Sequence, residues 1–188
     1  MRLILVSVAA AIVLGLVSGG TLRDFPSVKL RLAWLAAAGV FLQFVPVSGD
    51  LGFGVLLLSF ALLLAFAAVN LRSPGFVLIA TGLCLNALVI GLNHGMPVTR
   101  EALLGSDQAQ TLPDLLRNGG EKHHLADTRT VLLPLADVIA VGRPVDQAVS
   151  LGDVCVHLGI GWFIVVAMHP RRNVASPVLE RTGSGAAV

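Results

Sequence analysis

The chain has 188 residues, of which 55% are hydrophobic and only 13% are charged, and its mean hydropathy is +0.85. An ordinary soluble domain carries about 25% charged residues, so this composition excludes a typical water-soluble fold and favours lipid as the solvent. The net charge of +2 is too small to indicate a nucleic-acid partner.

Five apolar stretches approach the roughly 20 residues that a membrane-spanning helix needs. We predict spans at about 3–20, 30–47, 51–71, 76–92 and 151–168. The predicted fold class is therefore all-α, an integral membrane bundle of five transmembrane helices. The whole chain, 1–188, forms a single membrane domain in this interpretation, with an outer polar segment at 93–150 and a disordered tail at 175–188.

Lys and Arg in the short connections predict the orientation of the bundle. The first link carries Arg23, Lys29 and Arg31, the third carries Arg72, and the second carries none. More basic residues follow the last span. The positive-inside rule then places the N-terminus outside and the C-terminus inside a bacterial cytoplasmic membrane. A cleaved secretory signal, with Arg2 before its apolar core, is the competing interpretation of the first span.

The segment between the fourth and fifth spans is too polar to cross a membrane and too patterned for a loose linker. Short helices are predicted at 98–104 and at 111–117, where a Thr and an early Pro favour a helix start. A third short helix is predicted at 131–141, lying on the outer membrane surface. Any active or binding site is expected in this outer segment.

Two acidic residues are predicted to lie at the outer membrane boundary. Asp137 interrupts an apolar run, and Asp153 opens the last span. Ionised carboxylates beside hydrocarbon are costly, and two that lie close together share a proton, as in aspartic proteases. Asp137 and Asp153 are thus candidate catalytic residues. Alternatively, Ser150 and Asp153 form a helix capping box, and Asp137 makes a structural ion pair with Arg143 or Arg129.

Asn93 and Gly95 lie at the outer end of the fourth span, before a proline. The glycine permits an unusual backbone angle, and the asparagine is positioned to bind the backbone of a substrate. The alternative is an ordinary helix C-cap, in which these residue types satisfy the last carbonyl groups. Asn86, inside the same span, is interpreted as an interhelical hydrogen-bonding residue rather than a transport ligand.

The outer segment also contains His123, His124 and Asp127. His123 and Asp127 are four residues apart, a spacing that suits metal ligands on a helix, but no companion motif accompanies them, and we predict no metal or cofactor. With Lys122 and Arg129, the histidines suit an anionic lipid headgroup instead. No acidic or basic residue lies in the middle of a predicted span, which argues against an ion-coupled transporter.

Two stretches near the C-terminus resemble signal peptidase II, the lipoprotein signal peptidase. They are Leu-Ala-Asp-Val-Ile at 135–139 and Val-Ser-Leu-Gly-Asp at 149–153. The resemblance implies a catalytic dyad of Asp137 and Asp153, with Asn93 in an Asn-x-Gly element that contacts substrate. Ser150 occupies the place of that family's asparagine. The two spanning helices that the family has between its Asn-x-Gly element and its dyad have no counterpart here.

Over the whole chain, the pattern is similar to an uncharacterised family of small bacterial multi-pass membrane proteins. The similarity includes Asn-Xaa-Gly-Met-Pro-Val at 93–98, Lys-His at 122–123 and Ser-Xaa-Gly-Asp at 150–153. Two functions remain open. One is an aspartyl hydrolase that cleaves a membrane-anchored peptide or lipopeptide, with Asn93, Gly95, His124 and Ser150 binding substrate. The other is a non-enzymatic protein whose outer segment binds a lipid headgroup or a protein partner.

Overall fold

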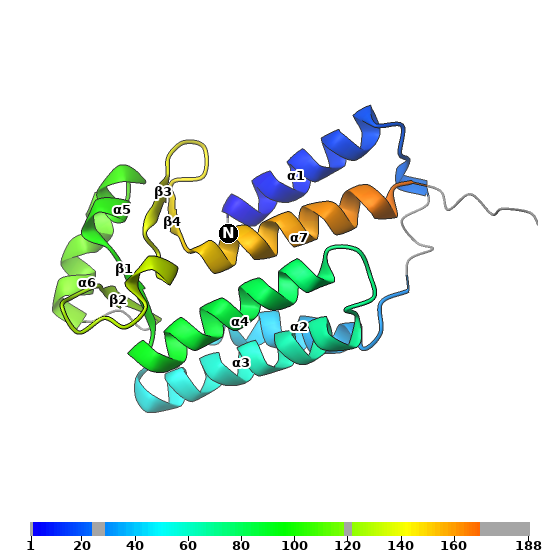
Figure 1. Ribbon diagram of the computed structural model, residues 1–188. Coiled ribbons are helices and arrows are strands. Elements are labelled where there is room, and N and C mark those ends of the chain that lie inside the picture. The colour runs from blue at the N-terminus through cyan, green and yellow to red at the C-terminus, as the bar shows by residue number, and fades with distance from the viewer. Residues whose placement is uncertain (1, 24–28, 119–121, 170–188) are drawn as a thin grey trace, which may run out of the picture.

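The computed structural model describes residues 2–23, 29–118 and 122–169, and these residues are mostly helical. The tail predicted at 175–188 and the basic residues predicted to follow the last span lie outside the described residues. The described chain forms an elongated bundle of apolar helices with a smaller polar part at one end (Figure 1).

Five apolar helices correspond to the five predicted spans. They are α1 (Arg2–Val17), α2 (Ala33–Leu42), α3 (Gly49–Val69), α4 (Phe76–Asn93) and α7 (Leu151–Ala167). Helix α7 packs against both α1 and α4, and α3 packs against both α2 and α4. The start of α1, the α2–α3 link, the end of α4 and the start of α7 lie at the same end of the bundle (Figure 1).

The lengths of these helices differ from the prediction. Within the described part of the chain, α3 and α4 are long and apolar enough to cross a membrane. Helices α1 and α7 have 16 and 17 residues. Helix α2 has only 10 residues and rises about 15 Å, about half the thickness of a bilayer core. Five complete spans therefore stay a prediction.

Glycines bring α4 and α7 into backbone contact. A Cβ atom added to Gly82 would collide with the carbonyl oxygen of Gly152, and one added to Gly75 would collide with that of Gly159. Small residues permit this close approach, which membrane helices use in place of a hydrophobic driving force. Gly91, on the same helix α4, has no atom near its Cβ position, so the contact is confined to one face.

The polar end of the molecule, called the cap, comprises residues 94–150. It contains helices α5 (Arg100–Gly105) and α6 (Leu112–Asn118) and four short strands. Strands β1 (Met96–Val98) and β2 (His123–Leu125) pair in parallel. Strands β3 (Ile139–Val141) and β4 (Gln147–Val149) form an antiparallel hairpin. The two short helices predicted at 98–104 and 111–117 are confirmed as α5 and α6.

The third helix predicted in the cap, at 131–141, is wrong. A 3-10 turn at Leu133–Leu135 is followed by extended chain and then by β3. The backbone N–H of Asp137 donates to the carbonyl of Pro97 (3.0 Å), and the carbonyl of Asp137 accepts from the N–H of Thr99 (3.2 Å). These contacts extend the β1 strand pairing to Asp137. Pairing with β1, which is distant in the sequence, therefore makes this stretch extended, although its local apolar pattern predicted a helix.

Candidate functional site

The first turn of α7 contains the predicted capping box. The Ser150 hydroxyl accepts a hydrogen bond from the Asp153 N–H (2.9 Å), and the Asp153 carboxylate accepts one from the Ser150 N–H (3.1 Å). Each residue thus satisfies a backbone donor that the helix start leaves free. The capping interpretation of Ser150 and Asp153 is therefore confirmed.

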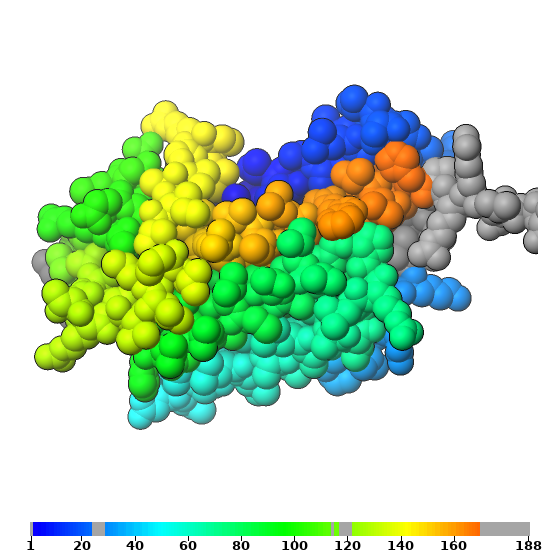
Figure 2. Space-filling model, viewed as in Figure 1, coloured from blue at the N-terminus to red at the C-terminus, as the bar shows by residue number. Residues whose placement is uncertain are grey.

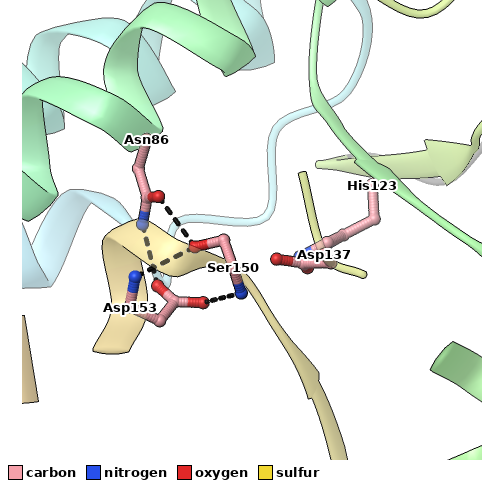
Figure 3. A network of polar contacts seen from close by, with 5 residues as sticks. All are labelled: Asn86, His123, Asp137, Ser150 and Asp153. Carbon is pink, nitrogen blue, oxygen red and sulfur yellow. Dashed lines mark hydrogen bonds and ion pairs between the residues drawn. The ribbon is translucent and has the colours of Figure 1, made fainter. Parts of the chain in front are cut away.

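Asn86 of α4 completes a buried polar network with these two residues. Its amide nitrogen donates to the Asp153 carboxylate (2.8 Å), and its amide oxygen accepts from the Ser150 hydroxyl (2.8 Å), as Figure 3 shows. The prediction that Asn86 makes an interhelical hydrogen bond is confirmed. Ser150 is fully buried and its hydroxyl is engaged on both sides. The structure therefore gives it a bracing role between α4 and α7.

Ser150→Ala should lower the free energy of unfolding by about 1–2 kcal/mol, because it removes an N-cap and leaves the Asn86 oxygen without its donor. Reversible unfolding of the purified protein in mixed micelles would measure the change. Ser18→Ala, at the exposed end of α1, is the matched control and should change little. A Ser150→Ala protein as stable as the parent would show that the network does not brace the bundle.

Asp137 lies between His123 and the start of α7 (Figure 3). Its side chain is only 7% exposed, and one carboxyl oxygen is buried without a hydrogen-bond partner. The other oxygen is 3.6 Å from Nε2 of His123. Burial, and then the negative charge of Asp153, raise the pKa of Asp137 to about 8. At neutral pH this carboxyl group is therefore mostly protonated and can donate a hydrogen bond.

His123 lines the cleft, and its side chain is 55% exposed. Desolvation lowers the pKa of His123 below its ordinary value. The contact between the two residues at neutral pH therefore joins a neutral acid and a neutral base. At 3.6 Å it is too long for a good hydrogen bond, which leaves the Asp137 proton available to a ligand.

Asp137 and His123 lie in the wall of a cleft of about 750 Å³ in the cap, a volume within the range of small-molecule sites. Two ion pairs also lie in this wall, Arg2 with Asp146 (2.7 Å) and Arg143 with Asp107 (3.7 Å). Among the described residues, the remaining polar side chains of the lining are uncharged: Gln108, Gln110, Thr111 and Gln147. With Arg2 and Arg143 paired and Asp137 protonated, the described part of this lining is polar but nearly neutral.

The structure brings some of the predicted site residues together and separates others. Asp137 and Asp153 make separate contacts: the Asp153 carboxylate accepts from Asn86 and from the Ser150 N–H, whereas Asp137 contacts His123. The charge of Asp153 nevertheless contributes to the raised pKa of Asp137. The predicted ion pair of Asp137 with Arg143 or Arg129 is wrong, because Arg143 pairs with Asp107 and the partner of Asp137 is His123.

The predicted substrate contacts lie elsewhere. The Asn93 side chain exchanges hydrogen bonds with the backbone of Val131 (2.8 and 2.9 Å), which ties the cap to α4. Gly95, with a φ of +146°, donates its N–H to the end of α4, as the C-cap interpretation predicted. His124 packs beside Gly95. None of these residues, nor Ser150, is among the described residues that line the cleft. Substrate binding by them stays a prediction.

Sequence reasoning missed the pairing of His123 with Asp137. The residues are 14 positions apart, and they meet only because β1 lies beside both β2 and residue 137. Three-residue strands leave no readable pattern in a sequence, so no local signal predicts this contact. Across residues 2–23, 29–118 and 122–169, no group of three or more His, Cys, Asp or Glu side chains is placed to hold a metal ion.

Comparison with protein-family models gives a match. A family model, described as a family of unknown function (DUF5317), matches residues 25–165 of the chain. No curated protein and no solved structure matches it. The resemblance to signal peptidase II is thus unconfirmed by comparison.

Proposed function

The chain belongs to the DUF5317 family, whose function is unknown, and we propose that it is a multi-pass membrane protein whose cap binds a polar, carbonyl-bearing ligand at the membrane surface. The observation that carries this proposal is Asp137, a buried carboxyl group with an unpartnered oxygen in the wall of a cleft. A buried polar atom without a partner is rare in native proteins and calls for an explanation such as a ligand.

Exposed apolar side chains support the membrane assignment. In α3 and α4, only 28% and 33% of the most apolar stretch is buried in the molecule, whereas the core helix of a soluble protein is mostly buried. Each of the five apolar helices has large hydrophobic side chains on its outside, among them Leu14, Phe41, Leu51, Val77 and Leu158. In lipid such faces need no protein partner.

The proposed topology has all five helices in the bilayer, with the cap and the N-terminus outside. Helix α2 covers about half of the bilayer, and the non-helical residues 43–48 would cover the rest. The end of α1, the start of α2 and the α3–α4 link lie at the end of the bundle opposite to the cap (Figure 1). The connections there carry Arg23, Arg31 and Arg72, so the positive-inside rule places that end in the cytoplasm. The cleft then opens at the outer surface of the membrane.

The chemistry of the cleft favours a carbonyl-bearing ligand such as an amide or an ester. A protonated Asp137 donates to a carbonyl oxygen, a role that an ionised carboxylate cannot perform. The glutamines and Thr111 provide further donors and acceptors, and both arginines are already paired with aspartates. A strongly anionic ligand would have to break those pairs, whereas a neutral head does not.

The test is the pH dependence of binding. The probe is an N-palmitoyl dipeptide amide that carries a photoreactive diazirine. The yield of its light-induced attachment to the protein in lipid nanodiscs would be measured from about pH 6 to pH 9. Labelling should fall as the pH rises through about 8, where Asp137 loses its proton. In Asp137→Asn, whose amide donates at every pH, labelling should persist. Asp50→Asn, at the start of α3, is the control and should follow the parent. A flat profile in the parent would contradict the proposal.

Hydrolysis is a second candidate function, favoured by the action of the Asp153 charge on Asp137. In such a reaction Asp137 would protonate the carbonyl oxygen of a membrane-anchored peptide while Asp153 activates water. Mass spectrometry would detect the hydrolysis products of the same probe. Asp137→Asn and Asp153→Asn should each abolish their release while Asp137→Asn retains binding. Intact probe after prolonged incubation with the parent protein would exclude this candidate and leave the binding function standing.

A further inference from the structure

A second cavity, apolar and about 580 Å³, lies on the bundle next to the cap. We call it the groove. Its walls are α1, α7 and the β3–β4 hairpin, and its apolar lining includes Leu14, Val149, Leu158 and Trp162. Figure 2 shows an indentation between the hairpin and the start of α1, where the groove meets the cap. In the proposed topology the groove faces the outer leaflet.

The β3–β4 hairpin is the wall between the groove and the cleft. Ile139, Val141 and Val149 line the groove, whereas Gln147 and Ala148 line the cleft. Alternation along β4 separates Ala148 from Val149, and Gln147, at the loop end of β4, also lines the cleft. The hairpin therefore contributes apolar side chains to one cavity and part of the wall of the other.

The two cavities also come close to each other at the first residues of α1. Arg2 lines the cleft, where it pairs with Asp146, and the adjacent Leu3 lines the groove. A molecule that follows α1 out of the membrane would thus pass from apolar walls to hydrogen-bonding walls within one residue of the chain. This juxtaposition fits a ligand that is itself apolar at one end and polar at the other.

We propose that the ligand is an acylated amphiphile whose alkyl chain lies in the groove and whose amide- or ester-bearing head enters the cleft. This inference rests on the proposed function of the cleft and names the class of its ligand. Both cavities have volumes typical of ligand sites. A water-soluble ligand would leave the groove unused, and a hydrocarbon would leave the donors of the cleft unused.

Gly161 provides a way to fill the groove. It lines the groove, and a Cβ atom added there would make only an ordinary contact with Ala11 (3.9 Å). Gly161→Leu should weaken labelling by the N-palmitoyl dipeptide amide roughly tenfold, the effect of displacing about two methylene groups. Gly91→Leu, at an exposed site on α4 with nothing near its Cβ, is the matched control and should label like the parent. Ser7→Phe, on the α1 wall, should repeat the loss independently.

The outcomes separate this inference from the proposed function. N-acetyl dipeptide amide should compete at least tenfold more weakly than the palmitoyl compound. Equal competition by the two, with pH dependence retained, would overturn the amphiphile and leave the cleft function intact. If labelling of the parent did not change with pH but labelling of Gly161→Leu was weaker than that of the parent, the proposed function of the cleft would be wrong. The groove would then still bind an alkyl chain. Equal labelling of Gly161→Leu and the parent would overturn the inference, because it would mean that the groove holds only exchanging bilayer lipid. Cross-linking of a second copy of the chain across the groove would overturn it as well.

Discussion

Asp137→Asn is expected to remove the loss of stability with rising pH that Asp137 causes in the parent protein between about pH 4 and 8. The pKa of Asp137 is raised from 3.8 to about 8 in the folded chain, so the folded state holds a proton that the unfolded state has already released. The contribution of Asp137 to the free energy of unfolding should therefore be largest below about pH 4. It should fall by about 1.4 kcal/mol for each pH unit up to about pH 8, which amounts to several kcal/mol in total.

The Asn variant keeps the shape of the side chain and cannot ionise, so it should not show this loss. Its remaining pH dependence should come from other groups, among them His123, whose lowered pKa makes stability rise with pH below about 6.5. At pH 8 the variant should be the more stable protein. Reversible unfolding in mixed micelles at a series of pH values would measure both proteins, with Asp50→Asn as the control for removal of a carboxylate at the same end of the bundle. Parallel curves for the parent and Asp137→Asn would show that the group is ionised at neutral pH, and the donor role in the cleft would fail with it.

Gly82→Ala should be a strongly disruptive single-methyl change in the bundle. Its Cβ would collide with the carbonyl oxygen of Gly152 and press against Val156. Both neighbours belong to α7, and the clash with backbone cannot be relieved by rotating a side chain. Overpacking of this kind costs about 1–3 kcal/mol. The hydrogen bonds of Asn86, one turn farther along α4, would weaken as the helices separate.

Gly91→Ala is the matched substitution on the same helix, because open space surrounds its Cβ position. It should be neutral or stabilising by up to about 1 kcal/mol, since alanine favours helix over glycine. Unfolding titrations of the two variants beside the parent would test the difference. If both substitutions had the same effect, backbone contact between α4 and α7 would not be what holds these helices together.

Local features of the sequence were sufficient for much of the architecture. Runs of apolar residues predicted where five helices would lie, because an apolar helix in lipid needs only its own backbone hydrogen bonds. The capping box of Ser150 and Asp153 was predicted because its partners lie three residues apart. The bonding role of Asn86 was predicted from its polarity within an apolar span, although its partners were not.

The candidate site was predicted only in part. Asp137 was noticed because a carboxyl group in an apolar run has to be accommodated, and the interpretation of Asp153 as a cap proved right. The partner of Asp137 was predicted to be Asp153 in a proton-sharing dyad or, alternatively, Arg143 or Arg129 on grounds of charge. The folded chain supplies His123 instead, since in a buried environment the acid is protonated and does not require a cation.

The sequence by itself determined that this chain is rich in apolar helices, where they lie, and how the last one begins, because these properties depend on residues within one or two turns of each other. Only the tertiary structure decided that residues 131–141 are mainly extended, that Asp137 faces His123, and that a polar cleft and an apolar groove share the β3–β4 hairpin. Those features come from backbone pairing and packing between distant segments, and residues far apart in the chain carry no local signal of where they will meet.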